Sequence, residues 1–180
     1  MRLMIASDIH GSAYYMEQLV EAYKREGAEK LLLLGDLLYH GPRNDLPQGY
    51  EPKKVIQILN GMKEELLCVR GNCEAEVDQM VLEFPVLADY IMLYLDGHTF
   101  FATHGHHYNE DSLPPLKKGD ILLHGHTHIQ ALKKTDDYIY LNPGSVSIPK
   151  AGNTNSYMIY DSHTVTLKSL SGDVIDELSL

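Results

Sequence analysis

Short apolar runs alternate with segments of helical periodicity in the first part of the chain. Residues 2–7 and 30–34 are apolar runs of strand length that end at polar residues and glycine, which is typical of buried strands. Between them, residues 12–26 repeat apolar side chains at helical spacing, with Ser12 available to cap the helix and Gly27 to end it. This β-α-β pattern predicts a parallel sheet that is covered on both faces.

A second helix and a third strand follow a loop rich in glycine and proline. Residues 41–52 form that loop, and Pro52 fits the first turn of a helix with apolar residues on one face. Residues 66–69 are predicted to form a strand, and residues 74–82 a short helical stretch.

The second half of the chain changes to hairpins. Residues 91–95 and 98–102 flank Asp96-Gly97, a dipeptide that suits a type I′ turn. We expect one domain over residues 1–180, in which two sheets pack face to face with helices outside. The remaining predicted strands are residues 121–123, 129–134, 138–141, 156–161, 164–170 and 174–179.

The composition narrows the classes of partner. The net charge is −10 and no block of Lys and Arg occurs, so no stable nucleic-acid complex is expected. The apolar runs are too short to span a membrane, and the start of the chain lacks a signal peptide, which favours a cytoplasmic protein. Cys68 lies in an apolar run and Cys73 in a polar loop, which argues against a structural disulfide. Strand edges after residue 155 are compatible with a homo-oligomer.

Seven side chains with free lone pairs follow the predicted strands, in five short motifs that each come after an apolar run. We therefore expect them on loops along one edge of a sheet. Their nitrogen and oxygen donors suit divalent Mn, Fe, Co, Ni or Zn, and a purely structural zinc site is disfavoured because no thiolate is required. The seven residues are Asp8, His10, Asp36, Asn72, His104, His126 and His128.

The ligand charges favour a phosphate substrate. Two divalent ions bring four positive charges, and Asp8 and Asp36 remove only two of them. A bridging hydroxide leaves a net positive cluster, which attracts a phosphate even inside an acidic protein. Two ions about 3.5–4 Å apart can also generate that hydroxide and clamp both sides of an in-line displacement at phosphorus.

The five motifs together resemble those of the calcineurin-like metallophosphoesterases, in order from residue 3 to about residue 149. The motifs are Asp8-x-His10, Gly35-Asp36, Gly71-Asn72, His104-Gly-His106 and Gly125-His126-x-His128. Longer stretches are similar to the bacterial YfcE-type phosphodiesterases. These stretches are His40-Gly-Pro-Arg-Asn44, Val69-Arg-Gly-Asn-Cys73, Glu76-Val-Asp-Gln-Met80 and Asn142-Pro-Gly-Ser-Val-Ser-Ile-Pro149.

The resemblance implies an α/β fold, a four-layer α/β/β/α sandwich with two mixed β-sheets flanked by helices. It also implies two divalent metal ions, for which we predict Mn²⁺, with Ni²⁺, Co²⁺, Fe²⁺ and Zn²⁺ as alternatives. Asn72 and His104 are the predicted catalytic residues. One ion would take Asp8, His10 and His128, the other would take Asn72, His104 and His126, and Asp36 would bridge the two.

The chain departs from the broader family at Cys73, where many members carry a histidine that assists the leaving group. A neutral thiol is a poor proton donor, so we expect a preference for phosphodiesters with good leaving groups. Cys73 either contacts substrate or fills space near Asn72. Arg43 is a second candidate for substrate binding, because its guanidinium can hold a phosphate, or it is a salt-bridged loop residue. His40 is the third candidate.

The predicted function is hydrolysis of small phosphodiesters by a hydroxide that the metal pair activates. A phosphomonoesterase would want more cationic groups, and a nuclease would be expected to show a basic groove. A non-catalytic scaffold, as in the retromer coat, would be free to lose the ligands that are all present here. His106 and His124 could be ligands by composition, but their spacing favours a supporting role.

Overall fold

The structure, a computed structural model, describes residues 1–180. Its helices are α1 (Ala13–Glu26), α2 (Pro52–Gly61), α3 (Glu76–Gln79) and the 3-10 helix η1 (Lys63–Glu65). Its strands are β1 (Leu3–Ala6), β2 (Lys30–Leu33), β3 (Leu66–Cys68), β4 (Tyr90–Leu95), β5 (His98–Thr103), β6 (Ile121–Leu123), β7 (Gln130–Lys134), β8 (Ile139–Pro143), β9 (Ser156–Asp161), β10 (Thr164–Ser169) and β11 (Val174–Ser179).

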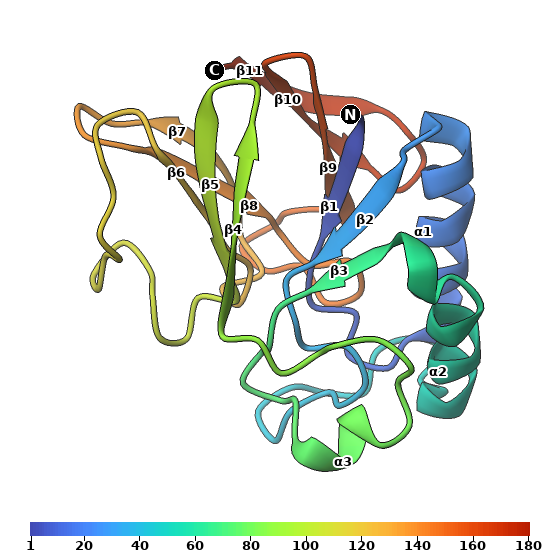
Figure 1. Ribbon diagram of the computed structural model, residues 1–180. Helices are drawn as coiled ribbons and strands as arrows, with labels where there is room; N and C mark the ends of the chain where they lie inside the picture. Colours follow the sequence, from blue (N-terminus) through green and yellow to red (C-terminus); the bar gives the residue numbers. More distant parts are fainter.

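Two mixed β-sheets pack face to face, as predicted (Figure 1). The six-stranded sheet has the order β11-β10-β9-β1-β2-β3 and the five-stranded sheet the order β4-β5-β6-β8-β7. Strands β1, β2 and β3 are parallel to one another, as are β5, β6 and β8. Each sheet also contains antiparallel hairpins, such as β4–β5 and β9–β10.

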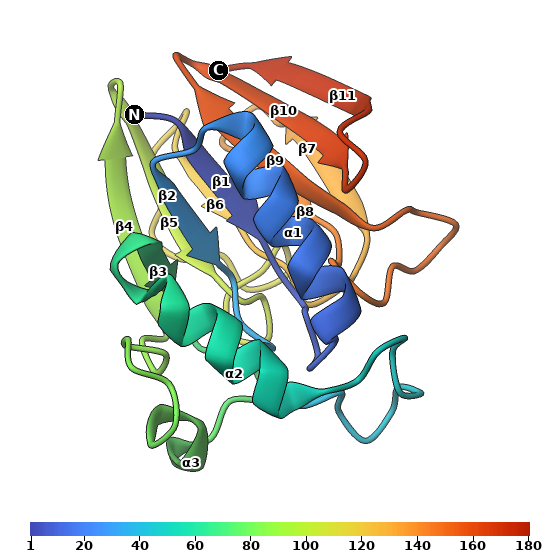
Figure 2. The same cartoon turned by 90° about the vertical axis from the view of Figure 1, so that its right-hand side faces the viewer.

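The alternation of side chains along β1 divides the core into two layers. Met4 and Ala6 belong to the cluster between the six-stranded sheet and helices α1 and α2, which lie side by side on that face (Figure 2). Leu3 and Ile5 belong to the cluster between the two sheets. Successive strand residues point to opposite faces, so this strand is buried on both sides.

The capping signals of α1 act as expected. The Ser12 side chain accepts a hydrogen bond from the Tyr15 backbone N–H at 3.2 Å, and Gly27 ends the helix in the left-handed conformation. The Asp96-Gly97 turn has positive φ at both residues, as a type I′ turn requires. The four-residue α3 is shorter than predicted, because Val77 and Met80 are exposed there and a helix without a buried face gains little stability from packing.

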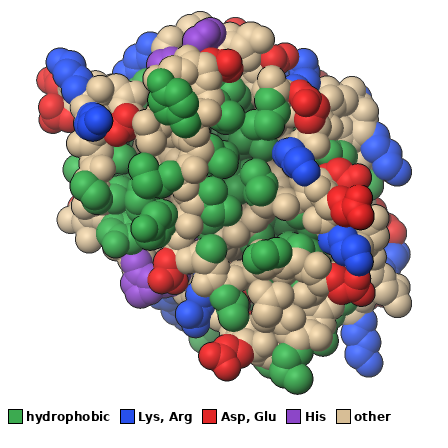
Figure 3. Space-filling view, viewed as in Figure 1, with side chains coloured by type: hydrophobic (Ala, Val, Ile, Leu, Met, Phe, Trp, Pro, Cys, Tyr) green, Lys and Arg blue, Asp and Glu red, His purple; other side chains and the backbone are tan.

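The outer face of the five-stranded sheet carries a loop, residues 104–120, where we expected a second layer of helices (Figure 1). Tyr108 and Leu116 of this loop pack on Phe101 and Leu122 of the sheet. Apolar side chains also gather on the face of the molecule shown in Figure 3. No helix has both the length and the apolar character that a membrane span needs.

Candidate metal centre

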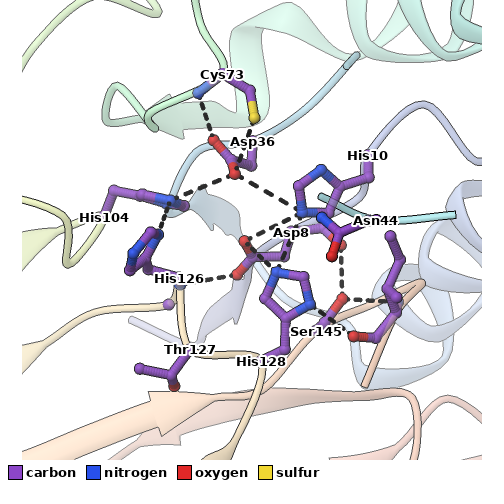
Figure 4. Close-up of polar contacts among 12 residues, drawn as sticks. Asp8, His10, Asp36, Asn44, Cys73, His104, His126, Thr127, His128 and Ser145 are labelled. Carbon is purple, nitrogen blue, oxygen red and sulfur yellow. Dashed lines mark hydrogen bonds and ion pairs between the residues drawn. The ribbon is translucent and has the colours of Figure 1, made fainter. Parts of the chain in front are cut away.

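The seven predicted ligands come together at one edge of the two sheets. Strands β1, β2 and β3 run parallel, as do β5 and β6, so the loops after them meet on the same side of the molecule. Figure 4 shows the imidazoles and carboxylates pointing toward a common centre. Asp8 and His10 follow β1, Asp36 follows β2, Asn72 follows β3, His104 follows β5, and His126 and His128 follow β6.

The backbone is unusual at five of these positions. Asp8, His10, Asp36, His126 and His128 have φ between 49° and 65°, the left-handed region that non-glycine residues rarely adopt. Each such residue costs of order 1–3 kcal/mol, and such costs concentrate at functional sites. The strain is held by hydrogen bonds between loops, since the backbone N–H groups at positions 8 and 10 donate to carbonyls of the loop after β2, at 3.1 and 2.9 Å.

The first group of donors is Asp8, His10 and His128. Nδ1 of His10 lies 2.7 Å from the Tyr39 carbonyl, and Nδ1 of His128 lies 2.6 Å from the Ile148 carbonyl. A carbonyl only accepts, so Nδ1 carries the proton and Nε2 of the neutral ring presents a lone pair. The two Nε2 atoms nevertheless lie 3.2 Å apart, and 3.5 and 3.2 Å from Asp8 Oδ1, which has no hydrogen-bond partner. Three acceptors that face one another fit a cation.

The second group is Asn72, His104 and His126. His104 Nδ1 donates to the Leu34 carbonyl at 2.7 Å, so Nε2 is the ring nitrogen that faces the centre. This Nε2 lies 3.1 Å from Asn72 Oδ1 and 3.1 Å from His126 Nδ1. Donors that share a metal with bonds of about 2.1 Å are roughly 3.0–3.4 Å apart. The spacing of both groups therefore fits a divalent ion.

Asp36 lies between the two groups. Its Oδ2 is 3.7 Å from His10 Nε2 and 3.5 Å from His104 Nε2, so one carboxylate oxygen approaches a ligand atom of each group. Asp8 links the groups in another way, because its Oδ2 accepts a hydrogen bond from the His126 backbone N–H at 3.0 Å.

Protons and metal ions compete for these lone pairs. Burial raises the pKa of Asp8, but contacts with His10 and His128 outweigh burial and hold it well below its usual range. Burial lowers the pKa of His104, but Asp36 and Asp8 outweigh burial and raise it to about 9. In the metal-free protein, protonated imidazole offsets the carboxylates, and a metal ion must displace that proton to bind.

The Asn142-Pro-Gly-Ser turn supports the centre from behind. Ser145 and Ser147 donate from their hydroxyls to the Asp8 carbonyl at 2.8 and 3.1 Å. Asn142 Nδ2 donates to the Gly125 carbonyl at 2.9 Å, within the loop that carries His126 and His128. The turn thus fixes both loops without offering a ligand of its own.

A cavity of about 40 Å³ opens over the centre. Arg43 and Cys73 line it, whereas His40 does not; the ring of His40 packs edge-on against Tyr39 and Tyr50. Two further residues of the cavity wall, Asn44 and Lys150, were not among the candidates from the sequence. Lys150 directly follows the last stretch of family resemblance, which is the only sequence signal for it.

The thiol of Cys73 is held as a neutral group beside Asp36. Its Sγ lies 3.3 Å from Asp36 Oδ2 and its backbone N–H donates to Asp36 Oδ1 at 2.9 Å. Burial raises the pKa of this thiol, and the negative charge of Asp36 raises it further. Cys73 is therefore neutral at physiological pH.

His106 and His124 stand outside both donor groups. His124 is buried, with Nδ1 3.0 Å from the Gly125 carbonyl and its ring against Tyr140. His106 packs edge-on against His104. Burial lowers the pKa of both rings, to about 4 for His106, so both are neutral packing groups around the centre.

Known proteins resemble this chain in both sequence and fold. The calcineurin-like phosphoesterase superfamily domain matches residues 1–165. The phosphodiesterase YfcE of Escherichia coli is 45% identical over 175 residues, which cover 97% of this chain and 95% of that protein. The probable metallophosphoesterase YsnB of Bacillus subtilis is 26% identical over 193 residues, which cover 99% of this chain and 96% of that protein.

The structural comparison agrees. The solved structure of YfcE, a phosphoesterase from E. coli, superposes with a TM-score of 0.97 at 43% identity and covers 99% of each chain. Vacuolar Protein Sorting 29 from Cryptosporidium parvum superposes with a TM-score of 0.62 at 16% identity, over 99% of this chain and 98% of that one, which shows a shared fold alone. Family match, sequence identity and superposition together establish that the chain belongs to the calcineurin-like phosphoesterase superfamily.

Proposed function

We propose that the protein is a metal-dependent phosphodiesterase that hydrolyses small phosphodiesters. The observation that carries the proposal is the convergence of ring nitrogens and side-chain oxygens at metal-ligand spacing: His10 Nε2 lies 3.2 Å from His128 Nε2, and His104 Nε2 lies 3.1 Å from Asn72 Oδ1. Lone pairs that converge at such spacing bind either a proton or a metal ion, and two such groups side by side fit a pair of divalent ions. The likeness to YfcE, which is named as a phosphodiesterase, supports the choice of reaction.

The two donor groups would each hold one divalent ion, and Asp36 would contact both. Nitrogen and oxygen donors without a thiolate favour Mn²⁺ within the range of metals that such sites accept. Two bound ions would supply Lewis-acid activation of the phosphate and of an attacking water. Asn72 lines the cavity, whereas the His104 side chain is fully buried, so His104 would serve catalysis by holding its ion in place.

The cavity suits the phosphate group more than its organic substituents. Its volume is about 40 Å³ and its wall is almost entirely polar, without a Phe, Tyr or Trp side chain on which a base or phenol could stack. Arg43, Asn44 and Lys150 would donate to the phosphate oxygens from the wall. The organic groups would then project outward, which favours small and varied phosphodiesters.

A phosphomonoesterase is the second candidate, and Lys150 is the observation that favours it. A dianionic monoester needs more positive charge than a diester. The cavity wall offers two cations, Arg43 and Lys150, where the sequence suggested one. Neither cation forms a salt bridge within the chain, so both are free for substrate.

Hydrolysis of two chromogenic substrates separates these functions. Metal-stripped protein would be assayed with Mn²⁺ added back, on bis-p-nitrophenyl phosphate and on p-nitrophenyl phosphate. We expect metal-dependent cleavage of the diester, abolished in the Asn72→Ala and His104→Ala variants. Preferential cleavage of the monoester would overturn the substrate class. A folded protein without activity in any divalent metal would favour a non-catalytic scaffold.

A homo-oligomer and the absence of a stable nucleic-acid complex are also part of the proposal. Strand β4 lies at one edge of its sheet and exposes Tyr90, Met92 and Tyr94, an apolar surface of the kind that protein contacts cover. Light scattering after size exclusion would measure the oligomeric state, and a monomer at all concentrations would contradict that part.

A further inference from the structure

The Glu74 carboxylate lies behind the metal centre instead of in the cavity. Its side chain is buried, with 4% of the residue exposed, and it is absent from the cavity wall. Oε2 accepts hydrogen bonds from the backbone N–H groups of Asp36 and Gly71 at 2.8 and 2.6 Å, and Oε1 accepts one from Leu37 at 2.7 Å. Its partners are three amides from two loops, so Glu74 joins the loop after β2 to the loop after β3.

The two loops hold each other reciprocally. Asp36, from the loop after β2, accepts from the Cys73 backbone N–H at 2.9 Å, while Glu74, from the loop after β3, accepts from the backbone at Asp36. The loops touch through their backbones, because a Cβ placed on Gly35 would lie 2.4 Å from the Gly71 nitrogen. A small shift of one loop therefore moves the other.

We propose that Glu74 is a positioning residue that fixes Asp36 relative to Asn72 and thereby sets the affinity for the second metal ion. The inference rests on the proposed two-metal function. Asp36 has φ of 55°, and Glu74 binds the N–H of that strained residue directly. Asn72 lies two residues before Glu74, so one carboxylate controls a proposed bridging ligand and a proposed terminal ligand.

The negative charge of Glu74 should favour metal binding in addition to its effect on the position of the loops. Glu74 is a buried acidic group whose partners are neutral amides, and no cationic side chain of the protein pairs with it. Bound divalent ions beside Asp36 would bring positive charge close to it. Glu74 thus favours metal binding without being a ligand.

The test is the Glu74→Gln variant, which keeps the shape and replaces one oxygen by an NH₂ group. That NH₂ group would face a backbone N–H, so the side chain at position 74 loses at least one of its hydrogen bonds to the two loops. Mn²⁺ binding to metal-stripped protein would be followed by calorimetry and by electron paramagnetic resonance of the coupled ion pair. We expect the affinity for the weaker ion to fall by about tenfold or more, as for other groups that orient metal ligands, and turnover to recover at high Mn²⁺.

Glu76→Gln is the matched control, because it makes the same charge change two residues away on the exposed face of α3. It should bind both ions as the wild type does. Glu74→Asp keeps the charge but shortens the reach, and should weaken the same ion. Wild-type affinity for both ions in Glu74→Gln, or the failure of both Glu74 variants to fold, would overturn the proposal. A wild-type protein that binds no pair of ions would instead overturn the proposed function.

Discussion

Gly125 is the point at which the loop after β6 presses on the end of β1, and adding one methyl group there tests how the centre is assembled. A Cβ at this position would lie 1.9 Å from Ser7 Oγ and 2.7 Å from Asp8 Oδ2. Both distances are far below ordinary contact, and the backbone at Gly125 is outside the left-handed region. Gly125→Ala therefore acts by steric conflict, which pushes His126 away from Asp8.

The magnitude follows from overpacking. Extra atoms in a well-packed region cost about 1–3 kcal/mol, and a domain of this size loses about 2–4 °C in Tm per kcal/mol. The Tm of the metal-free protein should therefore fall by about 2–12 °C. Metal binding should suffer as well, because the His126 backbone N–H donates to Asp8 at 3.0 Å and the two residues belong to different donor groups. Displacing such an orienting contact should weaken Mn²⁺ binding by about tenfold or more.

The assay is thermal unfolding in the presence of a chelator, followed by calorimetric titration with Mn²⁺. Gly61→Ala is the matched control. Gly61 is the last residue of α2, and a Cβ there would meet nothing within 4 Å. That variant should unfold at the wild-type temperature or above it, since alanine in a helix is favoured over glycine by about 0.5–1 kcal/mol.

Wild-type stability and Mn²⁺ affinity in Gly125→Ala would refute the reasoning. Such a result would mean that the two loops are not in tight contact at Asp8. Lower stability with unchanged affinity would separate packing from metal binding and would contradict the assignment of His126 and Asp8 to adjacent ions.

Three further predictions address the cavity, the leaving group and pH. Lys150→Gln should raise KM for bis-p-nitrophenyl phosphate about two- to fivefold with little change in kcat, as expected for loss of one exposed charge that contacts the phosphate. Lys53→Gln, which removes a distant charge, is the control, and equal effects of the two variants would exclude that contact. Cys73→His should raise turnover of methyl aryl phosphates with poor leaving groups by about tenfold or more, because histidine supplies a proton donor at this position. A uniform effect on good and poor leaving groups would exclude proton donation from this position. Burial raises the pKa of Glu26, but hydrogen bonds from Lys168 and two other side chains outweigh burial and lower it. That stabilisation is present at neutral pH and is lost as pH falls through the lowered pKa. Glu26→Gln should therefore lower the free energy of unfolding by about 1.5–3 kcal/mol at pH 7 and by much less at pH 3. Equal losses at both pH values, measured by urea unfolding, would disprove the linkage.

Much of the fold could be predicted because local signals and burial agree. Ser12 and Gly27 cap α1 as expected, and the strands of the two sheets begin and end within a few residues of the apolar runs. The extent of α3 was overestimated, because the sequence does not say that Val77 and Met80 point to solvent. The loop between residues 103 and 121 was left without a predicted helix or strand, but the sequence did not indicate that its Tyr108 and Leu116 pack on the five-stranded sheet, because they lie in no periodic pattern.

The site could be predicted only in part. The seven donors were found because each motif follows a strand, but their roles as ligands stay predictions until metal binding is measured. The left-handed backbone at Asp8 and its neighbours depends on contacts between loops, which no single segment encodes. Glu74 is recognisable only when three amides from two loops are seen around it. Lys150 follows a motif without belonging to a pattern, and His40 was drawn into the site by proximity in sequence although its ring packs elsewhere.

The most direct test of the two-metal centre is anomalous diffraction from crystals of the metal-stripped protein soaked in Mn²⁺. We predict two anomalous peaks about 3.5–4 Å apart, one among Asp8, His10 and His128 and the other among Asn72, His104 and His126, with Asp36 between them. A single peak, or peaks that leave either group of donors without a metal, would contradict the account.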